Sequence, residues 1–119
     1  MSCVWNGIIS ALKLNMRPLD LLQLVQEKNI ETVDVVWNNQ ELTKQNYTEN
    51  MERIKSISPR EISCGYDCSS CDPLLLLIAQ IFNVSIIHNY NNVIINYTNK
   101  KYPYNKINVA SNNNHFWNH

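Results

Sequence analysis

The cysteine nearest the start of the sequence is the first candidate for chemistry. Cys3 comes directly before an apolar run, residues 4–12, that has the spacing of a helix. A thiol at a helix start lies near the positive end of the helix dipole and near backbone N–H groups with no partner in the helix. Both stabilise the thiolate and lower the thiol pKa from its free value of about 8.5. Cys3 is therefore a candidate nucleophile; the alternative is a small apolar residue in a frayed segment.

A cysteine nucleophile needs a base within hydrogen-bond reach, and the sequence has 3 histidines. His88 follows an apolar strand-like run, and His119 is the last residue of the sequence. His115 stands between a run of asparagines and the aromatic pair Phe116-Trp117. An imidazole where a loop enters a strand is well placed at a cleft, so His115 is the preferred base. The alternative is a solvated loop histidine.

The remaining three of the 4 cysteines, Cys64, Cys68 and Cys71, stand close together. Thiolates at such spacing can bind zinc, with His88 or His119 as a fourth ligand. Three cysteines without a second pair are a weaker zinc signal than two Cys-x-x-Cys pairs. The preferred interpretation is reduced cysteines in a loop, with no metal and no other cofactor. A zinc-stabilised interaction domain is the alternative.

Local patterns predict helices in the first part of the chain and strands in the last. Asp72 suits a helix N-cap and Pro73 a first helical position, and the apolar run to Phe82 predicts a central buried helix. Further helices are predicted over 5–13, 18–29 and 40–57, and strands over 84–88, 93–98, 106–110 and 115–117. The fold class predicted is α+β, with helices packed on a small antiparallel sheet.

Composition bounds the function. A chain of 119 residues predicts one domain, residues 1–119, with a single core. Lysine plus arginine and aspartate plus glutamate number 10 each, and this balance disfavours nucleic acid as a partner. No run reaches the roughly 18 apolar residues of a membrane span, and the first residues lack the pattern of a signal peptide. We therefore expect an intracellular, cytoplasmic protein without a membrane partner.

Four segments, in their order along the chain, resemble the ovarian-tumour (OTU) family of papain-like cysteine proteases, deubiquitinases with many viral members. Residues 2–12 resemble the nucleophile motif, a cysteine followed by a bulky residue and a helix. Residues 47–54 resemble the helix ahead of the family's loop, and residues 72–87 the central helix that runs into a strand. Residues 114–117, Asn-His-Phe-Trp, resemble the closing histidine–aromatic motif.

The resemblance implies a papain-like, OTU-type fold with Cys3 as nucleophile and His115 as general base and then general acid. Backbone N–H groups of Cys3 and its neighbours would stabilise the oxyanion. The substrate would be a peptide or isopeptide bond after the tail of ubiquitin or a ubiquitin-like protein, or a junction in a viral polyprotein. For a viral protein, the expected location is the host cytoplasm.

The chain also departs from the family pattern. The family often has an aspartate shortly before the cysteine, and here only Met1 and Ser2 precede it, as expected for a domain cut from a longer protein. The family often has Asp or Asn two positions after the histidine, and here Trp117 stands there. Asn118 is the preferred residue to orient the imidazole; Asn113, or no residue at all, is the alternative. These departures leave a catalytically inactive OTU-like binding module as a second hypothesis.

Two of the 3 tryptophans are predicted to line the cleft. In papain-like clefts an aromatic beside the cysteine or the histidine walls the narrow channel for the substrate tail, which suggests Trp5 and Trp117 as substrate-binding residues. Plain packing in the core is the alternative for both, and for Trp37.

Overall fold

Helices come first along the chain and most strands come last. The structure is a computed structural model that describes residues 3–64, 66, 68–111 and 116–118, with the backbone alone for Cys3, Cys64 and residues 116–118. The helices are α1 (Cys3–Leu12), α2 (Pro18–Glu27), α3 (Lys44–Lys55), α4 (Arg60–Cys64) and α5 (Pro73–Ile81). The strands are β1 (Val35–Trp37), β2 (Ser85–Tyr90), β3 (Val93–Asn99), β4 (Lys106–Ser111) and β5 (Phe116–Asn118). This order confirms the α+β class.

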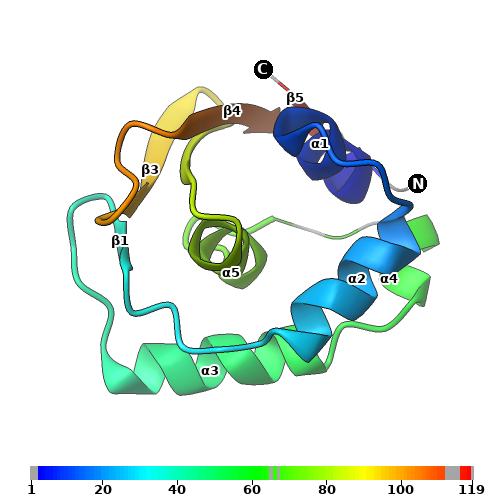
Figure 1. The fold of residues 1–119 in the computed structure, drawn as a ribbon, viewed down its shortest axis with the longest axis horizontal. Helices are drawn as coiled ribbons and strands as arrows, with labels where there is room; N and C mark the ends of the chain where they lie inside the picture. The colour runs from blue at the N-terminus through cyan, green and yellow to red at the C-terminus, as the bar shows by residue number, and fades with distance from the viewer. Residues whose placement is uncertain (1–2, 65, 67, 112–115, 119) are drawn as a thin grey trace.

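Helix α5 forms the centre of the core. In Figure 1 it lies inside a ring, with the sheet on one side, α3 on the opposite side, and α1 and α2 closing the gap between them. All residues from Leu74 to Ala79 are buried, as predicted for an apolar run without a polar face. Each fully buried leucine or isoleucine contributes about 2 kcal/mol of apolar burial, so this helix is a large part of the folding free energy.

The start of α5 is capped as the sequence predicts. The Asp72 carboxylate accepts hydrogen bonds from the backbone N–H groups of Leu74 at 2.9 Å and Leu75 at 3.3 Å, and Pro73 occupies the first helical position. This cap is fully buried, and it also accepts a hydrogen bond from the Tyr66 hydroxyl at 2.9 Å. The cap therefore ties the start of the central helix to the loop that precedes it.

The sheet has five strands in the order β1-β3-β2-β4-β5. The prediction of an antiparallel sheet is wrong for one pair, because β2 and β4 run parallel. The reason is topological: β3 ends beside the start of β2, and residues 100–105 keep the chain at that end of the sheet, so β4 starts beside Ser85 and runs in the same direction as β2. The crossover is held at the start of β2, where the Ser85 N–H donates to the Asn105 carbonyl at 2.8 Å.

The β2–β3 hairpin closes through Asn91 and Asn92. Both have positive φ, 50° and 68°, which is the backbone of a two-residue hairpin turn that matches the twist of the strands. Asparagine tolerates this conformation better than other residues with a side chain. The predicted hairpin is confirmed, with a turn shorter than the four residues that the sequence suggested.

Other helix boundaries shift by a few residues. Helix α3 begins after Thr43, whose hydroxyl accepts from the Asn46 N–H at 3.1 Å, so the predicted helix start at residue 40 is too early. The short helix α4, which contains Cys64, lies between the predicted helices and was not predicted. No helix among the residues listed above as described has the length and apolar character needed to cross a membrane.

We predict that Asp72→Ala lowers the free energy of unfolding by about 3 kcal/mol, because it removes a helix cap and leaves the buried Tyr66 hydroxyl without its acceptor. The melting temperature should fall by roughly 10 °C. Thr43→Ala removes an exposed cap of the same kind and should lose only about 1 kcal/mol. Equal losses in urea unfolding for the two variants would contradict the structural role given to Asp72.

Candidate active site

The first helix and the last strand meet in space. Helix α1, which begins at Cys3, packs against β5 and against the neighbouring β4. In Figure 1, α1 lies beside the β4–β5 end of the sheet. Strand β5 begins at Phe116, the residue after His115 in the sequence. The fold therefore brings the helix that starts at the predicted nucleophile to the strand that follows the predicted base.

Helix α1 is seated by one apolar face. Val4, Trp5 and Ile8 are buried in the core, whereas Asn6 and Ser10 are exposed. This is the periodicity of an amphipathic helix, and it holds the start of α1 firmly against the core. The first turn of α1 contains no acidic residue. The first turn of α1 therefore carries no negative charge that would repel a thiolate at the helix start.

Trp5 does not lie at the surface. Its side chain is 0% exposed and packs edge-on against the Tyr66 ring, with centroids 6.1 Å apart and an interplanar angle of 69°. The Trp5 side chain has no exposed surface that a substrate could contact, so its position fits the alternative of packing in the core. The physical reason is helical spacing, since Trp5 lies three residues before the buried Ile8 on the same face of α1.

Tyr66 connects α1 to the cap of α5. Its ring contacts Trp5, and its hydroxyl donates to the Asp72 carboxylate at 2.9 Å. On its other side the Arg53 guanidinium lies over the ring, 5.2 Å from the centroid, and Arg53 pairs with Glu61 at 2.7 Å. Burial first, and then the nearby Asp72 charge, raises the pKa of the Tyr66 hydroxyl well above its usual value. Tyr66 therefore stays protonated and donates its hydrogen bond across the physiological pH range.

The end of β4 beside β5 carries a buried polar pair. The His88 Nε2 and the Ser111 Oγ are 2.7 Å apart, and both side chains are buried. The His88 ring also stacks on Tyr90, with centroids 5.4 Å apart and planes 4° from parallel. Ser111 pairs with Phe116 across the β4–β5 ladder. This polar pair therefore lies at the strand end next to the start of β5.

His88 is neutral inside the protein. Burial lowers the pKa of its imidazole from 6.5 to about 4, because the charged form loses its hydration there. A buried neutral histidine of this kind is a structural hydrogen-bonding group at pH 7.

The other predicted site residues fall partly outside the described structure. His115 and Asn113 lie outside the described residues, as does His119. Asn118 and Trp117 belong to β5, where their backbones pair with Val109 and Ala110 respectively, and their side chains lie outside the description. The predictions for these side chains stay predictions, while the predicted final strand is confirmed.

The cysteine cluster is only partly described. Cys71 is a free thiol, Cys68 and Cys71 are half-buried against the core, and the side chain of Cys64 lies outside the description. Burial, and then the neighbouring Asp72 charge, raises the pKa of the Cys71 thiol. Within the described part of the chain, no group of three His, Cys, Asp or Glu side chains is arranged to hold a metal ion. Cys71 is thus poorly placed to be a thiolate, whether as ligand or as nucleophile.

Two residues with contacts near the candidate site were not singled out from the sequence. Tyr66 sits in a segment that gives no periodic signal, and its role depends on contacts with α1 and α3. Ser111 lies just outside the predicted strand 106–110, and the structure shows that β4 extends to it. A polar residue at the end of an apolar strand was the available signal for Ser111.

Comparisons of the chain with protein-family models, with curated proteins and with solved structures find no match. A functional proposal for this chain therefore depends on its own residues and geometry.

We predict that His88 makes stability depend on pH. Between pH 6.5 and about 4 the unfolded chain binds a proton at this residue that the folded chain does not. The free energy of unfolding should therefore fall as pH falls through this window, by about 3 kcal/mol, and this contribution should level off below pH 4. His88→Gln, which keeps a nitrogen near the Nε2 position, should remove this part of the pH dependence.

The measurement is urea unfolding of both proteins at several pH values. Other carboxyl and imidazole groups titrate in both proteins, so they cancel in the difference between the two curves. A difference that stays constant from pH 7 to pH 4 would show that His88 is not the group responsible.

Proposed function

We propose that this chain is a small OTU-like cysteine protease that cleaves a peptide or isopeptide bond after the tail of ubiquitin or a ubiquitin-like protein. Cys3 is the nucleophile, His115 is the base, and Asn118 is the residue that orients the imidazole. Trp117 is the aromatic that lines the substrate channel. The observation that supports the proposal is the packing of α1, which begins at Cys3, against β5, which follows His115.

The proposed reaction has two stages. The Cys3 thiolate attacks the carbonyl carbon at the end of the tail, and backbone N–H groups at the start of α1 stabilise the oxyanion. The His115 imidazolium gives its proton to the leaving amine as the C–N bond breaks, which leaves a thioester on Cys3. His115 then takes a proton from water, the resulting hydroxide attacks the thioester carbonyl, and the Cys3 thiolate leaves as the acid is released.

Local electrostatics support Cys3 over the other described thiols. Cys3 begins a ten-residue helix with no acidic residue in its first turn, so the helix dipole favours its thiolate. Cys71 lies beside the buried Asp72 carboxylate, which favours its neutral thiol. The cysteine with the more favourable surroundings is the one that the family resemblance indicates.

We expect a ubiquitin probe with a C-terminal electrophile to form a covalent adduct on Cys3, because a thiolate at the tail-binding site attacks such a group. Peptide mass spectrometry of the adduct locates the modified cysteine. Cys3→Ser should abolish the adduct, while Cys68→Ser and Cys71→Ser are matched controls that should label like the parent protein.

A folded parent protein without an adduct on Cys3 would contradict the protease proposal. Stable binding of unmodified ubiquitin without any adduct would instead favour the inactive binding module.

His115→Ala should lower the rate of hydrolysis of a ubiquitin C-terminal coumarin amide by ~10²–10⁴, the usual loss when a general base is removed. His119→Ala is the control of the same residue type and should retain the parent rate. Unfolding curves of both variants show whether the fold is intact. Equal rates for His115→Ala and the parent would remove His115 from the mechanism.

A further inference from the structure

The end of β4 is held by two hydrogen bonds from the β2 side. The Ser111 hydroxyl lies 2.7 Å from the His88 Nε2, and the Ser111 carbonyl accepts a hydrogen bond from the Asn91 N–H at 2.9 Å. Ser111 is only 4% exposed and His88 is fully buried, so water does not compete for these bonds. Both partners come from β2 and its turn, on the side of β4 away from β5. The strand end is thus anchored to the inside of the sheet.

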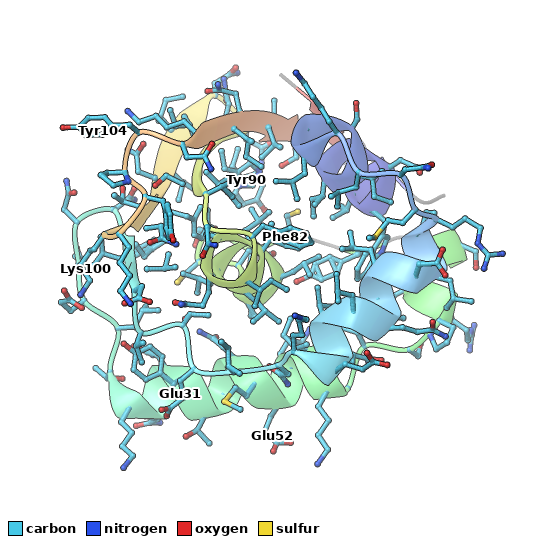
Figure 2. All side chains as sticks on the ribbon, in the orientation of Figure 1. Glu31, Glu52, Phe82, Tyr90, Lys100 and Tyr104 are labelled. Carbon is cyan, nitrogen blue, oxygen red and sulfur yellow. The ribbon has the colours of Figure 1, made fainter. Side chains whose placement is uncertain are left out.

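The same pair is connected to the helix that begins at Cys3. The His88 ring stacks on Tyr90, and the Tyr90 hydroxyl donates to the Cys68 carbonyl at 3.2 Å. Figure 2 labels Tyr90, which lies in that view between the strands and α5. The Cys68 segment follows Tyr66, whose ring contacts Trp5 in α1. These contacts therefore connect the end of β4 to the Cys68 carbonyl, and α1 to Tyr66, two residues before Cys68 in the sequence.

The chain passes from Ser111 through residues 112–115 into β5, and His115 is the last residue of that connection. This connection joins the end of β4 to the start of β5, and the two residues at its ends, Ser111 and Phe116, are partners in the β4–β5 ladder. The position two after His115 holds Trp117, which cannot accept a hydrogen bond as an aspartate or asparagine would. The placement of the base must then depend more heavily on the backbone that carries it.

We propose that Ser111 and His88 are positioning residues for the base of the proposed reaction, because they fix the strand end from which the connection with His115 leaves. The inference rests on the proposed protease function and adds to it two residues that touch neither substrate nor reacting atoms. A displacement of about 1 Å in a catalytic group lowers the rate by roughly 10²-fold. Removing the Ser111 hydroxyl should therefore act on turnover more than on binding.

The experiment measures kcat and KM for a ubiquitin C-terminal coumarin amide with the parent protein, Ser111→Ala and Val109→Ala. Val109 is the matched control, since it is fully buried in the same strand and packs through an apolar side chain alone. Assays are run well below each variant's melting temperature. We expect Ser111→Ala to lower kcat by about 10- to 100-fold with KM changed less than about twofold, and Val109→Ala to lower the melting temperature without this loss in kcat.

A second pair of variants tests the partner. His88→Gln keeps an N–H near the Nε2 position and should retain most of kcat, whereas His88→Leu removes the hydrogen bond and should reproduce the loss seen in Ser111→Ala. A merely structural role would lower the melting temperature in both His88 variants and leave their kcat values equal.

The outcomes separate this inference from the proposed function. An active parent protein whose kcat is unchanged in Ser111→Ala, or lowered equally in Val109→Ala, overturns the positioning role and leaves the protease function standing. A parent protein without Cys3-dependent turnover overturns both. A selective loss of kcat in Ser111→Ala and His88→Leu, with recovery in His88→Gln, supports the inference.

Discussion

One buried carboxylate connects most parts of this fold. Asp72 accepts hydrogen bonds from the start of α5, from the Ser69 N–H at 2.8 Å and from the Tyr66 hydroxyl, while its own N–H donates to the Tyr97 hydroxyl at 2.9 Å. Through these bonds it reaches the central helix, the cysteine-containing loop, β3 and, by way of Tyr66, α1. Burial raises the pKa of the Asp72 carboxyl, and the donors around it oppose that rise. A carboxylate is tolerated in the core here because it accepts hydrogen bonds from three backbone N–H groups and from the Tyr66 hydroxyl.

The same carboxylate also distinguishes the cysteines. Burial first, and then the charge of Asp72, raises the pKa of the Cys71 thiol, whereas the start of α1 offers Cys3 the positive end of a helix dipole. The surroundings of Cys71 therefore favour its thiol form, and those at the start of α1 favour a thiolate. Under the proposed function, the residue that caps the central helix also helps to keep Cys71 from competing with Cys3.

The sequence was sufficient where the signals were local. The aspartate–proline cap, the apolar run of α5 and the asparagine turn of the hairpin each act over a few residues, and all three predictions were confirmed. The parallel pairing of β2 with β4 could not be predicted, because it depends on which side of β2 is free after β3 has paired. For the same reason the His88–Ser111 contact was not foreseen, since it exists only once those two strands are neighbours. The burial of Trp5 could have been predicted, because Trp5 lies three residues before Ile8 and therefore on the same apolar face of the helix.

The meeting of α1 with β5 has a consequence for how the protein is made. Helix α1 leaves the ribosome before the rest of the described chain, and β5 leaves after all the other described elements. Until β5 emerges, α1 lacks the strand it packs against, and contacts between such distant segments form slowly because a long loop must close first. A site assembled from these two elements is therefore absent from any chain in which β5 has not yet been made. Under the proposed function, proteolytic activity would begin only after β5 has emerged and packed against α1, so a chain stopped before β5 would not cleave its surroundings.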